Sequence, residues 1–155
     1  MNTYAKTPLE IAAEIYGIDP RRFGEPKILR WGLAEVGATS IGQPVSIQAP
    51  QDLLICALSG QPNDGAAASF AGLELDFRYG DIDLVTDGKT AQRIPFSMLA
   101  GRGPGPSQAG GPWYAFKIPI LIQAGTPLTT SVRNRTAGAL TPSVAIDTVL
   151  LRSGR

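Results

Sequence analysis

From residue 28 onward, apolar side chains recur at every second position, and this period limits the fold more than any other feature of the chain. In the segment from Leu73 to Tyr79, for example, apolar and charged residues alternate without a break. Strict alternation places one face of a strand in the core and the other in solvent. The run from residue 53 to residue 58 is apolar on both faces, which predicts a central strand.

Eight segments have one of these two patterns. The predicted strands cover residues 28–36, 43–49, 52–59, 72–79, 81–86, 113–122, 127–134 and 143–151. Turn residues separate the strands, and no helical period lies between them. This order favours an antiparallel sandwich over a parallel α/β sheet.

The longest alternation contains a proline. Its apolar members are expected to share one face of the sheet: Tyr114, Phe116, Ile118, Ile120 and Ile122. Pro119 has no amide proton to donate to a ladder, so we expect it at a sheet edge or a bend. A strand that bends and continues into a second sheet is what a jelly roll or a related sandwich requires.

The N-terminal segment is different, because it carries the signals of one short helix. Thr7 is a cap, Pro8 suits the first turn, Glu10 completes a capping box and Gly17 is a stop. The candidates for burial on this helix are Leu9, Ile11, Ile15 and Tyr16. So short a helix is unstable alone in water, so it must dock on its own domain or on a neighbour.

These patterns predict two parts. Residues 1–26 form an N-terminal arm with a short helix, and residues 27–155 form the sandwich. The fold class is therefore all-β: an antiparallel eight-stranded β-sandwich, jelly-roll-like, with a short helix in its arm. Between the strands, residues 94–99 are expected to form an anchoring turn before a Gly/Pro-rich loop at 100–112, in which Arg102 is the obvious anchor for a partner.

Several classes of function are excluded by what the chain lacks. It contains no histidine, so a Ser-His-Asp triad, a cupin-type metal centre and a zinc hydrolase are ruled out. Its single cysteine, Cys56, allows no internal disulfide and is expected to be a buried structural thiol. With 14 basic and 13 acidic residues, the chain has no overall field to attract nucleic acid or a membrane. We expect no enzyme activity, no cofactor and no metal.

The N-terminus shows no signal sequence, and the longest apolar run is far shorter than the roughly 18 residues of a membrane helix. We therefore expect the protein to stay inside the cell that makes it.

Some residues allow a second interpretation. Glu74 and Asp76 could be a glycosidase pair, but solvent-facing strand carboxylates explain them better. Asp81, Asp83 and Asp87 have the spacing of a calcium loop without its final glutamate.

Two further motifs stay open in the same way. Asn134, Arg135 and Thr136 match a glycosylation acceptor, which means little without an export signal. Arg133 and Arg135 form either a basic edge for a neighbouring subunit or a solvated face.

The order of these features resembles small jelly-roll structural proteins of tailed bacteriophages. The segments that carry the resemblance are Asp19-Pro-Arg-Arg-Phe23, Gly42-Gln-Pro-Val-Ser-Ile47, Ile94-Pro-Phe-Ser-Met-Leu99, Pro119-Ile-Leu-Ile-Gln-Ala-Gly-Thr126 and Ser131-Val-Arg-Asn134. The resemblance implies a non-enzymatic virion protein, a capsid decoration or cement protein, with vertex, collar and fibre-base roles left open. Its implied partners are the major capsid protein, other virion subunits and copies of itself, and its implied location is the virion, assembled in the host cytoplasm.

The resemblance also implies which residues make contact. The arm would lie across an adjacent subunit through the apolar anchors Leu9, Ile11, Ile15, Tyr16 and Phe23, and through charge-assisted bonds of Arg21 and Arg22. Arg102, Arg133 and Arg135 would add further contacts. The alternative is a carbohydrate-binding sandwich for host recognition, in which Trp113 and Tyr114 stack on a sugar.

Overall fold

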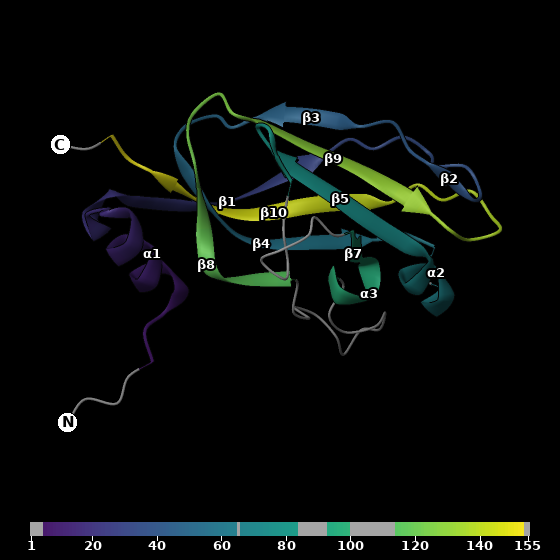
Figure 1. Cartoon of the computed structure of the whole chain (residues 1–155), viewed down its shortest axis with the longest axis horizontal. Coiled ribbons are helices and arrows are strands. Elements are labelled where there is room, and N and C mark those ends of the chain that lie inside the picture. Colours follow the sequence, from purple (N-terminus) through teal and green to yellow (C-terminus); the bar gives the residue numbers. More distant parts are fainter. Residues whose placement is uncertain (1–4, 65, 84–92, 100–113, 154–155) are drawn as a thin grey trace.

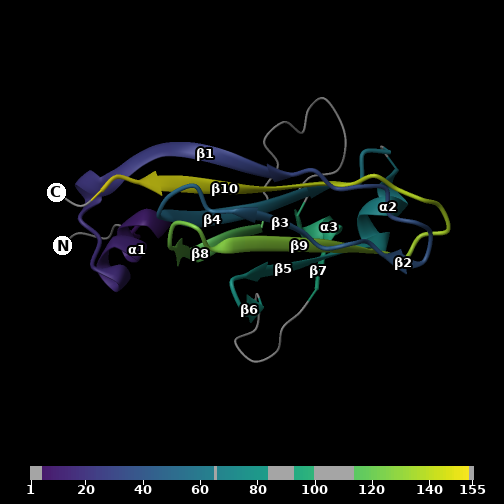
Figure 2. The same cartoon turned by 90° about the horizontal axis from the view of Figure 1, so that it is seen from above.

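The described residues form two packed antiparallel sheets, with three short α-helices and the 3-10 turn η1 (Pro20–Arg22) around them (Figures 1 and 2). The computed structural model describes residues 5–64, 66–83, 93–99 and 114–153. The first sheet has the order β1-β10-β4-β8, with β1 at Phe23–Trp31, β10 at Ser143–Leu151, β4 at Leu53–Gln61 and β8 at Tyr114–Ile122. In the second sheet, β9 (Pro127–Asn134) lies beside β5 (Leu73–Tyr79).

The outer strands of the second sheet are interrupted. On one side β2 (Ser40–Ile41) and β3 (Val45–Gln48) both pair with β9, and on the other side β6 (Ile82–Asp83) and β7 (Ile94–Pro95) both pair with β5. If each interrupted strand is counted once, the sheets have the orders 1-8-3-6 and 2-7-4-5. This is the eight-stranded order of a jelly roll, which confirms the predicted fold class.

The predicted strands match the observed ones with several differences. The first strand spans Phe23–Trp31 and not residues 28–36, and its register with β10 shifts between Phe23 and Pro26, which accommodates the proline on an edge strand. The strand predicted at 43–49 is observed as β3 (Val45–Gln48), and β2 (Ser40–Ile41), before Pro44, was not predicted. The segment after β4, expected to be a plain connector, contains helix α2 at Ala67–Gly72.

The turn predicted at residues 94–99 closes one end of the core. It consists of β7 and the short helix α3 (Phe96–Leu99). Phe96 and Leu99 are fully buried, and both lie close to Gly60 of β4, where a Cβ atom would come within 3.0 Å of Phe96 and 3.1 Å of Leu99. A side chain at this point of the central strand would therefore need Phe96 and Leu99 to shift, so a glycine lets the short helix pack closely.

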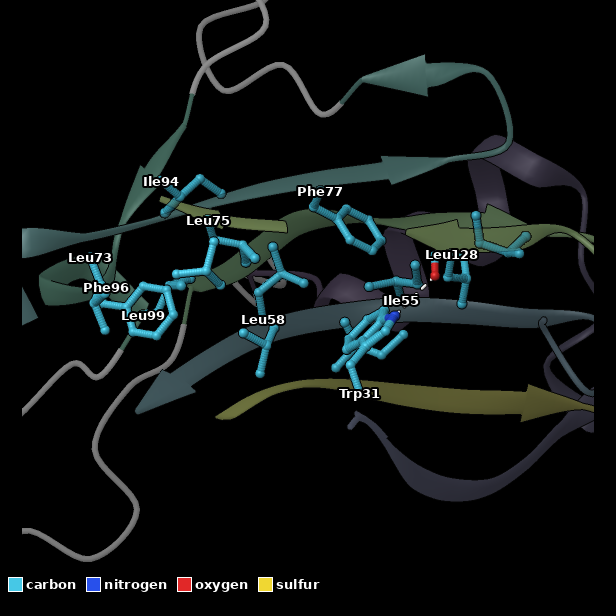
Figure 3. Close-up of a cluster of buried hydrophobic side chains, with 14 of the residues drawn as sticks. Trp31, Ile55, Leu58, Leu73, Leu75, Phe77, Ile94, Phe96, Leu99 and Leu128 are labelled. Atoms are coloured by element: carbon cyan, nitrogen blue, oxygen red, sulfur yellow. Dashed lines mark hydrogen bonds between the residues drawn. The ribbon is translucent and has the colours of Figure 1, made fainter. Parts of the chain in front are cut away.

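The main core lies between the inner faces of the two sheets (Figure 3). Trp31 contacts Phe77 edge to face, with ring centroids 6.0 Å apart, and its indole Nε1 donates a hydrogen bond of 2.9 Å to the carbonyl of Leu128. The first sheet supplies Trp31, and the second supplies the two residues that it contacts. This buried tryptophan therefore joins the sheets by packing and by a satisfied polar group.

Two buried threonines differ in whether their hydroxyl groups are hydrogen-bonded, and this difference provides a test of the core. Thr148 donates its hydroxyl to the carbonyl of Lys27 at 2.7 Å, whereas the hydroxyl of Thr130 has no hydrogen-bond partner among the described residues. We expect Thr130→Val to raise the free energy of unfolding by about 1 kcal/mol, because an unsatisfied buried hydroxyl is removed. The matched change Thr148→Val should lower it by about 1 kcal/mol, because a made bond is lost. Urea unfolding of both variants measures this, and a destabilised Thr130→Val would contradict it.

Candidate interaction surface

Helix α1 (Pro8–Tyr16) forms as its capping signals predict. The hydroxyl of Thr7 accepts a hydrogen bond of 3.2 Å from the backbone amide of Glu10, and Pro8 occupies the first turn. Gly17 ends the helix in the left-handed conformation with φ of 65° and donates its amide to the carbonyl of Ala13. Only glycine adopts this conformation without strain, so the helix boundary is determined locally.

The helix docks on its own domain, on the outer face of the first sheet. Ala12 and Ile18 are buried there against Leu54 of β4 and Leu151 of β10. The side chains at the border of this cluster are partly buried: Leu9, Phe23, Cys56 and Leu121. The chain's own sandwich thus partly shelters Leu9 and Phe23, two of the five apolar anchors that the resemblance assigned to an adjacent subunit.

A second apolar face remains outside. Ile15 is 56% exposed, Tyr16 is 36% exposed, and Ile118 of β8 is 46% exposed. The hydroxyl of Tyr16 donates a hydrogen bond of 2.8 Å to the carbonyl of Pro119, which brings the end of the helix onto β8 beside Ile118. We call these three side chains the α1–β8 surface. Ile11, one turn before Ile15 on the helix, is half-buried.

The exposure of Ile118 corrects the prediction that it shares the buried face of β8. The pairing of β4 with β8 is irregular in the middle. Two steps along β4, from Ile55 to Ala57, lie opposite five steps along β8, from Ile120 to Ala115. Pro119 lies inside this irregular stretch of an edge strand, as its missing amide proton predicted. The regular pairing of β8 with β4 is lost in this stretch, and Ile118 within it is 46% exposed.

The two arginines of the arm make contacts within the chain. Arg21 pairs with Asp19 at 2.7 Å, and hydrogen bonding to Arg21 lowers the pKa of this carboxyl to about 2. Arg22 donates to the backbone carbonyl of Arg152 at 2.8 Å and lies 4.0 Å from the carboxylate of Asp52. Arg22 therefore holds the start of β1 on the sandwich, whereas the side chain of Arg21 is 91% exposed.

The other predicted charged residues lie on the outer face of the second sheet. Arg135 pairs with Glu74 at 2.6 Å, and Arg93 pairs with Asp76 at 2.8 Å. Arg133 lies directly across the ladder from Glu74. Each carboxylate of the hypothetical glycosidase pair thus holds an arginine, which is the arrangement of a salt-bridged sheet face.

Three residues of the predicted contacts cannot be placed in this way. Arg102 and Trp113 lie outside the described residues. Tyr114 begins β8 opposite Leu58, but its side chain is outside the described part of the chain.

The asparagine of the glycosylation motif, Asn134, is buried and therefore inaccessible. Asn134 has no exposed surface, and its Nδ2 donates to the carbonyls of Val36 and Gly138 at 3.1 and 2.9 Å. Its Oδ1 accepts from the backbone amide and the hydroxyl of Thr136. Both amide hydrogens are used, so the nitrogen is unavailable for modification in the folded protein.

This network predicts a large stability effect from a small substitution. Asn134→Ala should lower the free energy of unfolding by about 2–3 kcal/mol, because it removes all the hydrogen bonds of a fully buried side chain that joins Val36, Thr136 and Gly138. The neighbouring exposed change Arg135→Ala should cost less than about 1 kcal/mol, since its ion pair with Glu74 is at the surface. Thermal unfolding of the two variants provides the measurement, and equal losses would contradict the assigned network.

Cys56 lies at the border of the cluster under α1. Its thiol is half-buried, and burial, with a smaller effect of the charge of Asp147, raises its pKa to about 11. Because the thiolate is the reactive form, this position favours an inert thiol.

The thiol therefore reports whether α1 is docked. At pH 8 we expect Cys56 to react with iodoacetamide at least about 100-fold more slowly than a free cysteine, whose pKa is about 8.5. In Ala12→Glu the added carboxylate cannot be buried at the contact, so α1 should leave, the pKa of Cys56 should fall and alkylation should accelerate. Mass spectrometry of the alkylated protein follows the rate. Equal rates in the two proteins would show that α1 does not cover Cys56.

The described residues contain no group of three or more histidine, cysteine, aspartate or glutamate side chains that could hold a metal ion. Among the helices in the described ranges, none is long and apolar enough to cross a membrane. Comparison of the chain with protein-family models, with curated proteins and with solved structures found no match in any of the three.

Proposed function

We propose that this protein is a non-enzymatic structural subunit of a tailed-phage virion, a capsid decoration or cement protein that binds neighbouring subunits. The observation that carries the proposal is the α1–β8 surface: large apolar side chains of a helix and an edge strand remain exposed after the core and the helix cluster have formed. Exposed apolar side chains that lie together are typical of protein interfaces. The jelly-roll sandwich and the resemblance described above support the same role.

Only some residues of the arm are proposed to contact the neighbouring subunit. Leu9 and Phe23 contribute to the intramolecular cluster, and Arg22 holds the end of the sandwich. Ile15, Tyr16 and Ile118 remain for the neighbouring subunit, and the exposed guanidinium of Arg21 lies on the same arm. An apolar centre with an arginine near its border is a frequent composition of binding hot spots.

We expect Ile15→Asp combined with Ile118→Asp to abolish incorporation into particles without unfolding the protein. Both side chains are largely exposed, so the free energy of unfolding should change by less than about 1 kcal/mol, whereas a charge in an apolar contact should weaken binding at least about tenfold. The measurement is quantitative mass spectrometry of particles purified from the phage whose genome encodes the chain. Ile41→Asp is the matched control, since Ile41 is 53% exposed on β2 of the other sheet.

Two results would contradict the proposal. Absence of the unmodified protein from purified particles would remove the virion role. Normal incorporation of the double variant, with loss in Ile41→Asp, would move the contact to the second sheet.

A further inference from the structure

Helix α1 rests on an apolar cluster that is separate from the main core. The cluster joins Ala12 and Ile18 to Leu54 and Leu151 on the outer face of the first sheet, while the core proper lies between the two sheets. A contact of this kind can open without disturbing the packing between the sheets, because local openings follow cooperative units of structure. The arm is therefore a unit that can leave while the sandwich stays folded.

Few polar contacts oppose this opening. The lysine, threonine and glutamate hydrogen bonds near the start of α1 stay within the arm, between Lys6 and Glu14 and between Thr7 and Glu10. The bond from Tyr16 to the carbonyl of Pro119 links the helix to β8. Beyond the helix, Arg22 is held by Arg152, so the point of release lies between Ile18 and Arg22.

The connector in this interval is one short 3-10 turn, η1 (Pro20–Arg22), capped by the side chain of Asp19. Asp19 and Pro20 are exposed, and the bonds of Asp19 run to its neighbour Arg21 and not to the sandwich. In both views α1 lies at one end of the sandwich, next to the start of β1 (Figures 1 and 2). The point about which the arm would pivot is therefore this turn at the end of the molecule.

The groove that α1 leaves would be lined by Leu54, Leu151, Leu121 and Cys56. In the structure this groove is covered by α1 of the same chain. Every copy of the chain carries the same helix. A detached α1 is too short to be stable in water, so it favours any equivalent groove within reach. The exposed Ile15 and Tyr16 lie on the same helix, so copies that meet through the α1–β8 surface bring two grooves and two arms together.

We propose that the groove under α1 accepts α1 from a second copy of this chain, so that neighbouring copies exchange arms. This inference rests on the assembly role proposed above, because exchange must compete with the high effective concentration of a tethered arm and is favoured where copies are held side by side. Exchange reproduces the intramolecular contacts between two copies, so that each arm stays covalently attached to its own sandwich and docks non-covalently on the other.

A pair of full-length variants tests the groove directly. The acceptor is Ala12→Glu, whose own arm cannot dock and whose single cysteine, Cys56, is uncovered. The donor combines Leu54→Glu with Cys56→Ser, so its groove is blocked, its helix is intact and it carries no thiol. Only the acceptor can then be alkylated by iodoacetamide.

We expect excess donor, up to about 1 mM, to slow alkylation of the acceptor at least about tenfold and to produce a heterodimer in size-exclusion chromatography with light scattering. A control donor that also carries Ala12→Glu should give neither effect. If Leu54→Glu does not fold, as judged by thermal unfolding, Leu151→Glu blocks the same groove in its place.

Unchanged alkylation of the acceptor at the highest donor concentration would overturn the exchange. Protection by the control donor as well would also overturn it, since the contact would then not involve α1. Either result concerns purified variants in solution and leaves the particle measurements unaffected, so failure of the exchange and failure of the virion role are distinguishable.

Discussion

The structure depends on the packing of β4, because this strand is apolar on both faces. Its inner side chains, including Leu53, Ile55 and Leu58, belong to the core between the sheets. Its outer side chain Leu54 lies under α1. A central strand with two apolar faces needs cover on both sides, and the second sheet can cover only one of them. The helix of the arm supplies the other cover.

Docking of α1 over the outer face of β4 leaves some apolar side chains of the helix exposed. Helix α1 carries apolar side chains on two sides. Ala12 is buried on the sheet, whereas Ile15 and Tyr16 stay exposed. The edge strand β8 is irregular around Pro119, whose carbonyl accepts the hydrogen bond of Tyr16, and Ile118 is exposed in the same stretch. Ile15, Tyr16 and Ile118 thus stay exposed on the arm and on the bulged edge strand, whereas on the outer face of the second sheet arginines pair with Glu74 and Asp76. The contrast between these two faces is the physical basis for the assembly role.

Much of the fold could be predicted because its signals are local. The period of two located the strands, and the capping residues located α1 at the residues where it is observed. The missing amide proton of Pro119 placed it at an irregular edge. The predictions were wrong where tertiary contacts overrode a local signal. Residues Ala67–Gly72 form a helix although turn residues dominate the segment. Ile118 is exposed, in the stretch where the register between β4 and β8 shifts.

What the sequence alone determined is the set of elements: the strands and their alternation, the helix from Pro8 to Tyr16, and the buried turn around Phe96. The tertiary structure decided where the helix docks, that Leu9 and Phe23 belong to an intramolecular cluster, and that Ile15 and Ile118 stay exposed. The reason is physical. Periodicity and capping act over a few neighbouring residues, whereas the choice between shelter on the same chain and shelter on another depends on which distant apolar surface, here Leu54 and Leu151, is left uncovered when the sheets have packed.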